Sequence, residues 1–410
     1  MRYYIYTFLF LIAILLNSCG YDQMIEDSPR NLYGDPGRTS NYEDYSEFYS
    51  AFHAAYDMKG DDTTGALQAP LVVRSYEIVA ATSGGSIIVL NDSGVMLTFR
   101  LDSNELVASA MCADPQENIY ALTNMGNLYK IGLDGHLFFK KNLFPNEDFS
   151  RIFSDLLTTG DAIYAADREG LLVKLDTLGQ IIWQREFASA IGETFAADDR
   201  GRIILPLVSG GFQGEDTLLV LDNDGVRQAE RAFPGRIINS PVAQRGRIYI
   251  SVEQEIRGNR LSKIYCLDAD LNTIWDKELA VMPRYLSVSD AYEVYATGYN
   301  AGIGQPMSGL YAFDSTGTLL WKIYAKAAIP APLIITETQI IASGITENGP
   351  VAFFFKRKTG VMIKQMSLAN VPALYPVPAA TPDRKVIFLG SGELKLVTID
   401  DTQINKLLPY

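Results

Sequence analysis

A short unit recurs along this chain of 410 residues, and its recurrence constrains the fold more than any other feature. The clearest copy, residues 309–325, reads GLYAFDSTGTLLWKIYA. It consists of two apolar stretches joined by a polar turn that ends in glycine, which tolerates the positive φ of a tight hairpin. Related copies start at Ile87, Leu172, Leu218 and Tyr265. We therefore expect a repeat fold built from antiparallel hairpins.

The turn glycine sets the period of the repeat. The copies align Gly94, Gly135, Gly179, Gly225, Leu271, Gly317, Gly360 and Gln403, at intervals of 41 to 46 residues. An acidic residue often stands three positions earlier, and all three tryptophans of the chain stand four positions later. We assign these positions a structural role, with the best copies supplying Asp176, Gly179, Trp183, Asp268, Trp275, Asp314, Gly317 and Trp321.

Each unit has the same internal order of strands. A short apolar strand and a strand of alternating character precede the hairpin, which gives four strands per unit. A period of this length is that of a propeller blade, and closing a ring limits the number of exposed strand edges. Eight units predict an all-β fold, an eight-bladed β-propeller of four-stranded antiparallel blades, over residues 67–410.

The N-terminus reads MRYYIYTFLFLIAILLNSC. Its apolar run is shorter than the ~20 residues that span a bilayer, which favours a signal peptide over residues 1–18. The Leu-x-Ser-Cys ending resembles the bacterial lipobox, which implies lipidation of Cys19. Gly20 follows instead of the aspartate of inner-membrane lipoproteins, so we expect the outer membrane, in either leaflet. The alternative is an ordinary secretory signal with an incidental cysteine.

Residues 19–66 are predicted to form an acidic tether. Between residues 20 and 67 there are ten acidic residues and three basic ones, as in a solvated linker. Within the tether, aromatic residues from Tyr42 to Tyr56 recur at spacings of three and four, which predicts a helix over residues 41–58. Such a stripe packs on its own domain or docks on a partner, and disorder is the third alternative.

Composition and motifs argue against several functions. Two histidines leave little room for a histidine-based metal site or base, and the net charge of −13 argues against binding to nucleic acid. The acidic turn 222–225 is a poor calcium loop and fits a hairpin turn better. We expect no metal, no cofactor and no enzyme activity. Cys112 and Cys266 lie in distant repeats, so we expect two buried thiols instead of a disulfide.

The strand, turn and tryptophan pattern resembles the repeat of the PQQ-like quinoprotein propellers, best in residues 310–321 and in 175–183. In that family the tryptophan docks on the neighbouring blade. The resemblance implies either a quinone-dependent dehydrogenase or a BamB-like lipoprotein, a lipid-anchored propeller that assists outer-membrane protein assembly. The chain has no Cys-Cys pair and is short for a dehydrogenase, which favours the second group.

The loops between the second and third strands supply a candidate binding surface. They are short in the first three units and long in the next three. Equivalent propeller loops emerge on one face, so the long loops are expected to form a continuous arc. Aromatic, methionine and arginine residues favour binding patches. The predicted contact residues are Phe212, Ile256, Arg257, Tyr299 and Met307.

The sequence therefore predicts a non-enzymatic, lipid-anchored scaffold in the bacterial envelope, with outer-membrane or other envelope proteins as partners. A BamB-like role in outer-membrane protein assembly is the leading interpretation. A surface lipoprotein that binds glycans or other ligands is the first alternative, and a quinone-dependent dehydrogenase is the second.

Overall fold

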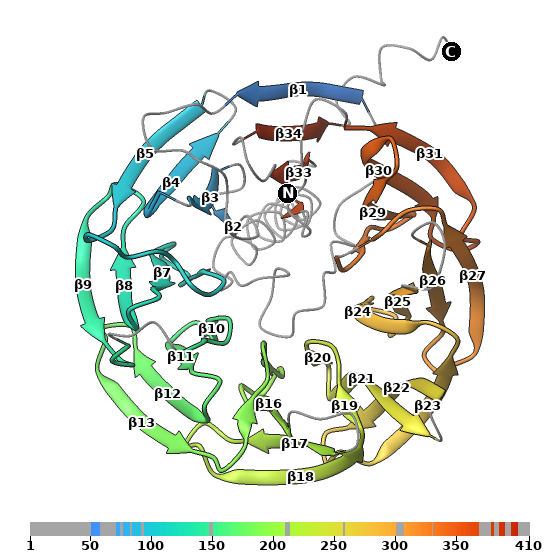
Figure 1. Ribbon diagram of the computed structural model, residues 1–410, viewed down its shortest axis with the longest axis horizontal. Coiled ribbons are helices and arrows are strands. Elements are labelled where there is room, and N and C mark those ends of the chain that lie inside the picture. Colours follow the sequence, from blue (N-terminus) through green and yellow to red (C-terminus); the bar gives the residue numbers. More distant parts are fainter. Residues whose placement is uncertain are drawn as a thin grey trace, which may run out of the picture.

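The strands of the molecule form a ring of radial sheets (Figure 1). The computed structural model describes residues 51–57, 71–73, 77–82, 84–91, 94–146, 151–209, 214–256, 259–300, 307–329, 331–368, 379–380, 385–389 and 395–400. Within these ranges there are eight antiparallel sheets. Seven contain strands that are consecutive in sequence, and the eighth combines the first strand with the last three. We number these blades along the chain.

In each blade the strands lie one beyond another, in order from the axis to the circumference of the ring (Figure 1). Blades 1 to 3 contain β2 (Leu71–Val73), β3 (Glu77–Ala81), β4 (Ser86–Asn91), β5 (Gly94–Arg100); β6 (Cys112–Ala113), β7 (Ile119–Leu122), β8 (Asn127–Ile131), β9 (Leu137–Asn142); β10 (Leu157–Thr158), β11 (Ala162–Ala166), β12 (Leu171–Asp176) and β13 (Ile181–Glu186). Blades 4 and 5 contain β14 (Ala190–Ile191), β15 (Ala196–Ala197), β16 (Ile203–Val208), β17 (Glu215–Leu221), β18 (Arg227–Pro234); β19 (Arg236–Ile237), β20 (Val242–Gln244), β21 (Arg247–Ile256), β22 (Asn259–Asp268) and β23 (Thr273–Leu279). In these two blades two short strands share the innermost place.

The remaining blades complete the ring. Blades 6 and 7 contain β24 (Met282–Val288), β25 (Val294–Asn300), β26 (Met307–Phe313), β27 (Leu319–Ala325); β28 (Ile334–Ile335), β29 (Gln339–Thr346), β30 (Gly349–Lys356) and β31 (Met362–Ser367). The closing blade contains β32 (Ala379–Ala380), β33 (Lys385–Leu389), β34 (Lys395–Asp400) and β1 (Ala51–Asp57). The prediction of an all-β propeller with four-stranded antiparallel blades is confirmed.

The closing blade corrects two predictions. Strand β1 pairs with β34 from Ala51↔Asp400 to Asp57↔Lys395 and takes the outermost place. The propeller therefore does not begin at residue 67, and the predicted helix 41–58 is wrong over Ala51–Asp57. The spacing of the aromatic residues gives only a weak local preference for a helix. The open edge of β34 offers backbone hydrogen bonds along the whole segment, and pairing with it outweighs that preference. Residues 41–50, the predicted signal peptide and Cys19 lie outside the described residues.

Apolar clusters fill the spaces between neighbouring blades. In β11, for example, Ile163 and Ala165 join the cluster shared with blade 2, whereas Ala162, Tyr164 and Ala166 join the one shared with blade 4. Successive side chains of a strand point to opposite faces, so a blade between two others is buried on both faces. This arrangement explains why the middle strands are continuous apolar runs.

The three tryptophans connect blades 3, 5 and 6 to the blade that follows each of them. A Cβ atom placed on Gly225, Gly317 or Gly360 would lie 3.1, 2.7 and 2.7 Å from the ring of Trp183, Trp275 and Trp321, respectively. Each indole Nε1 also donates a hydrogen bond to a turn carbonyl of the following blade: Asn223 at 2.8 Å, Ser315 at 3.2 Å and Arg357 at 2.8 Å. The structural role predicted for the tryptophan position agrees with these contacts.

The aspartates shape the turns. In the turn of blade 6, Asp314 Oδ1 accepts hydrogen bonds from the backbone N–H groups of Thr316 and Thr318, both at 2.9 Å. The hydroxyl of Thr316 donates to the same oxygen, and these bonds lower the pKa of Asp314 below its usual range. Asp176, Asp222 and Asp268 accept the corresponding backbone bonds in their turns.

A basic residue six positions after the turn glycine also joins the blades, and we did not predict it. Lys141, Arg185 and Arg231 donate to the carbonyls of Gly179, Gly225 and Leu271 in the following turn, at 2.7, 3.2 and 2.8 Å. The repeat alignment contained the signal, because five successive copies carry lysine or arginine there.

Candidate partner-binding surface

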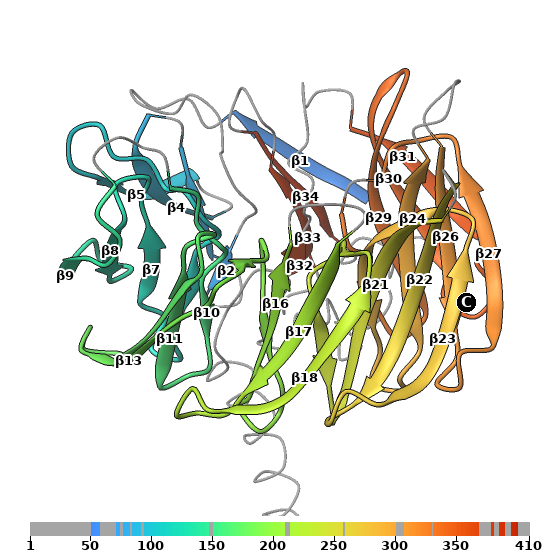
Figure 2. The ribbon, with the colours of Figure 1, turned by 60° about the horizontal axis from the view of Figure 1, so that its bottom comes forward.

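Four consecutive blades carry long hairpins between their second and third strands. The hairpins are β16–β17, β21–β22, β25–β26 and β29–β30, and we call them the long hairpins. Pairing extends to Ile256↔Asn259 in β21–β22 and to Asn300↔Met307 in β25–β26, whereas β7–β8 ends at Leu122↔Leu128. The long hairpins are neighbours around the ring, and Figure 2 shows β21, β22, β26, β29 and β30 on one side of it.

Hairpin β21–β22 projects beyond the rest of its blade. On one edge, the last pair between β21 and its inner neighbour joins Glu253 to Arg236. On the other edge, the last pair between β22 and β23 joins Ser262 to Leu279. The ribbon of residues 254–256 and 259–261 therefore extends past the last paired residues on both edges. A hairpin that projects from its sheet is a common place for a partner protein to dock.

One ion pair crosses this projecting ribbon near its base. Glu253 is buried, and its Oε1 lies 3.7 Å from Nη1 of Arg260, whose side chain is 57% exposed. The exposed end of the pair contributes little to stability, since water screens it. The pair holds the Arg260 guanidinium on the projecting ribbon, and arginine is enriched in binding patches.

A buried carboxylate holds the base of hairpin β16–β17. Asp216 accepts hydrogen bonds from the backbone N–H of Ser209 at 2.8 Å and from that of Ile237 at 2.8 Å. The hydroxyl of Ser209 donates to the same carboxylate at 3.0 Å. Buried charge is tolerated where hydrogen bonds satisfy it. Asp216 thus fixes the two ends of the loop that contains residue 212.

The structure describes some of the predicted contact residues and not others. Ile256, at the end of β21, is 49% exposed, as the prediction requires. Tyr299 lies in β25 opposite Met282, and Met307 begins β26 opposite Asn300, with only their backbones described. Phe212 and Arg257 lie outside the described residues. The binding role of all five residues stays a prediction.

Hairpin β29–β30 was missed by the sequence reasoning. It has eight pairs, from Gln339↔Lys356 to Thr346↔Gly349, and near its tip Ile345 is 42% exposed. A sequence signal was present, because Asn348 and Gly349 are residues typical of tight turns. The structure places the two-residue turn at Glu347 and Asn348, and Gly349 begins β30. The blade interval of 43 residues was near the average, so the repeat length gave no sign of the longer strands.

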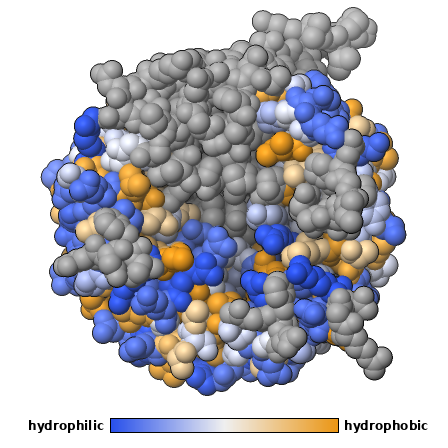
Figure 3. All heavy atoms as spheres, in the orientation of Figure 1, coloured by the Kyte–Doolittle hydropathy of each residue, from blue (hydrophilic) through white to orange (hydrophobic). Residues whose placement is uncertain are grey.

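Tyr324 adds an aromatic group beside the long hairpins. It lies near the end of β27, is 49% exposed, and its hydroxyl lies 3.3 Å from that of Tyr311. Burial raises the pKa of Tyr311, so that hydroxyl stays protonated at neutral pH. Figure 3 shows apolar residues as separate patches among hydrophilic ones on the face in view. A mixed surface of this kind suits a protein partner.

The described residues offer little chemistry. No group of three or more histidine, cysteine or acidic side chains within them is placed to hold a metal ion. Both described cysteines, Cys112 and Cys266, are buried, as expected, and no disulfide joins them. Burial raises the pKa of Cys266 to about 11, so this thiol is not a nucleophile at neutral pH. The described part of the chain also contains no helix long and apolar enough to cross a membrane.

The repeat, the ring and the tryptophan contacts define the class of protein: a β-propeller of PQQ-like repeats. The sequence model of a family described as "Outer membrane protein assembly factor BamB" matches residues 168–328. An outer membrane protein assembly factor BamB of Nitrosomonas eutropha is 29% identical over 179 residues, which are 43% of this chain and 40% of that protein. The chain thus matches less than half the length of this curated relative.

Two solved structures are similar over most of the chain. BamB from Moraxella catarrhalis gives a TM-score of 0.62 at 15% identity, covering 87% of this chain and 98% of that one. The Dos1 propeller gives 0.64 at 11% identity, covering 86% and 95%. At such identities the structures show the fold alone. With the sequence matches, the predicted resemblance is confirmed: the chain is a PQQ-like, BamB-like β-propeller.

Proposed function

We propose that this protein is a non-enzymatic, lipid-anchored scaffold of the bacterial envelope that acts in outer-membrane protein assembly through its long hairpins. The observation that carries the proposal is the sequence match to BamB over residues 168–328. This segment contains the whole of blades 4 to 6, which include three of the four long hairpins. The segment that matches the family model therefore contains most of the candidate surface.

The chemistry of the surface supports binding. Ile256 and Ile345 expose apolar area at the tips of hairpins two blades apart, and Tyr324 lies on the blade between them. Scattered apolar anchors in a polar surround are typical of partner sites that remain soluble when free.

Affinity capture tests the proposal. The tagged full chain is captured from membranes after mild crosslinking, and the recovered proteins are identified by mass spectrometry. We expect outer-membrane assembly proteins, and we expect Ile256→Asp with Ile345→Asp to reduce their recovery. The control is Ile182→Asp, since Ile182 is similarly exposed, at 53%, but lies on the outer strand β13. Recovery of no assembly protein, or equal loss with the control, would contradict the proposal.

A further inference from the structure

The junction between blades 4 and 5 lacks the tryptophan contact but compensates for it. Blade 4 has Ala229 at the tryptophan position, and blade 5 has Leu271 at the glycine position. Leu271 keeps the positive φ of the turn, at 66°, although a branched side chain disfavours it. Its side chain is buried in the cluster of this junction, and Ala229 packs against that cluster. At this junction the small residue is therefore on the first blade and the large one on the second, the reverse of the tryptophan–glycine junctions.

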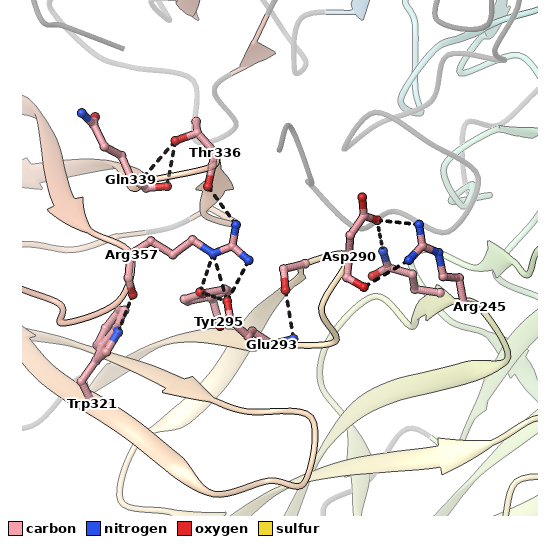
Figure 4. Close-up of polar contacts among 10 residues, drawn as sticks. Arg245, Asp290, Glu293, Tyr295, Trp321, Thr336, Gln339 and Arg357 are labelled. Carbon is pink, nitrogen blue, oxygen red and sulfur yellow. Dashed lines mark hydrogen bonds and ion pairs between the residues drawn. The ribbon is translucent and has the colours of Figure 1, made fainter. Parts of the chain in front are cut away.

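The junction between blades 6 and 7 differs in charge (Figure 4). Between blades 5 and 6, Arg247 at the start of β21 donates to the turn carbonyl of Ser315 at 2.8 Å. The corresponding residue of blade 6 is Glu293, and the aspartate position of the blade 7 turn holds Arg357. Arg357 pairs with Glu293 at 2.8 Å, and its Nε donates to the Tyr295 hydroxyl at 3.1 Å. The cation has moved to the opposite blade.

These contacts are mutually incompatible. A tryptophan facing a leucine turn would overlap it, because even a Cβ on Gly317 would lie 2.7 Å from the Trp275 ring. An alanine facing a glycine turn would leave a cavity where the ring belongs. An arginine at the place of Arg247 would meet Arg357 as a like charge. Each of blades 4 to 7 therefore packs better against its native neighbour than against another blade of this group.

We propose that the contacts at junctions 4/5, 5/6 and 6/7 specify which blade packs against which during folding. Similar repeats in one chain favour misassembly, within a molecule or between two. Contacts that match only the correct neighbour disfavour such alternatives, in the way that charge and size patterns select partners in other assemblies. The pairs Ala229–Leu271 and Glu293–Arg357 are the contacts that distinguish junctions 4/5 and 6/7 from junction 5/6.

Refolding tests this role separately from stability. Ala229→Trp with Leu271→Gly gives junction 4/5 the tryptophan and glycine of junction 5/6. Glu293→Arg with Arg357→Asp gives junction 6/7 the arginine and aspartate of junction 5/6. The full-length chain in mild detergent is unfolded in denaturant and diluted at two protein concentrations. Native monomer is measured by size-exclusion chromatography with light scattering. We expect the four-residue variant to lose roughly two-fold or more of its monomer yield, with oligomers that increase with concentration.

Two further variants complete the experiment. Ala229→Ser with Leu271→Met keeps a small residue on blade 4 and a large apolar residue on blade 5, so it should refold like the wild type. The Ala229→Trp, Leu271→Gly variant alone is refolded at a final denaturant concentration that lies as far below its own unfolding midpoint as that of the wild type does, so that a stability loss cannot explain a lower yield. If this variant then gives the same monomer yield as Ala229→Ser with Leu271→Met at both protein concentrations, the proposal is overturned.

Discussion

The indole ring of Trp275 lies directly on the turn glycine Gly317 of the next blade. A Cβ atom on Gly317 would lie 2.7 Å from Cδ2 of the ring, and the glycine has a φ of 79°. The indole Nε1 also donates to Ser315, two residues before the glycine. Trp275 of blade 5 thus determines the space available to the turn of blade 6.

Gly317→Ala is expected to destabilise the protein by about 2–4 kcal/mol, from positive-φ strain and overpacking against the ring. Chemical denaturation followed by tryptophan fluorescence measures the change. Gly246→Ala is the matched control, since Gly246 has a φ of 77° with nothing within 4 Å of the added Cβ. That variant should lose only about 1 kcal/mol from strain. Equal losses would show that the ring contact contributes nothing.

Arg357→Met is expected to lower the free energy of unfolding by about 1–3 kcal/mol, because Glu293 and the Tyr295 hydroxyl lose a partly buried donor. The side chains of Arg357 and Glu293 are only 10% and 26% exposed. Arg227→Met removes a pair with Glu230 at 58% and 43% exposure, where water screens the charges and the change should be near zero. Urea denaturation of both variants checks the difference. A loss with Arg227→Met as large as that with Arg357→Met would contradict it.

Removing strand β1 is expected to destabilise the closing blade. A chain that begins at residue 51 should keep the cooperative thermal transition of the full chain, because β1 still pairs with β34. A chain that begins at residue 58 leaves that edge of β34 open, which favours aggregation. Differential scanning calorimetry and light scattering compare the two truncations. Identical transitions would show that β1 is dispensable.

The Cys266 thiol is expected to resist alkylation in the folded protein at pH 8 and to react on unfolding. Its pKa is raised from 9.0 to about 11 by burial, so the folded state retains the proton that an unfolded thiol releases above pH 9. The folded state binds more protons in this window, and the contribution of Cys266 to stability therefore falls as pH rises from about 9 to 11. Iodoacetamide labelling with peptide mass spectrometry, with and without denaturant, checks the prediction. Rapid labelling of the native protein at pH 8 would refute it.

Cys19→Ser is expected to move the protein from the membrane fraction to the soluble fraction, since the predicted lipid anchor would be lost. Cell fractionation followed by immunoblotting measures the distribution. Cys112→Ser is the control, because Cys112 is buried inside the ring and should not affect fractionation. Unchanged membrane association of Cys19→Ser would argue against lipidation.

Sequence reasoning placed the candidate surface on the long loops, and it located three of the four long hairpins. It missed β29–β30 because the connection between these strands is a two-residue turn, and the interval of 43 residues between the neighbouring turn glycines is close to the average. It also predicted a helix for the segment that contains β1. Pairing between residues 51 and 400 is a contact across nearly the whole chain, and no local pattern can report it.

The sequence by itself determined the repeat, the order of strands within a blade and the turn chemistry. These features depend on residues close together in the chain, so periodicity and turn composition reveal them. Only the tertiary structure decided which segment completes the closing blade, and which residues meet across each junction. Those choices depend on the fit of surfaces distant in sequence: Leu271 replaces a glycine without a clash because Ala229, in the preceding blade, leaves the space that a tryptophan fills elsewhere.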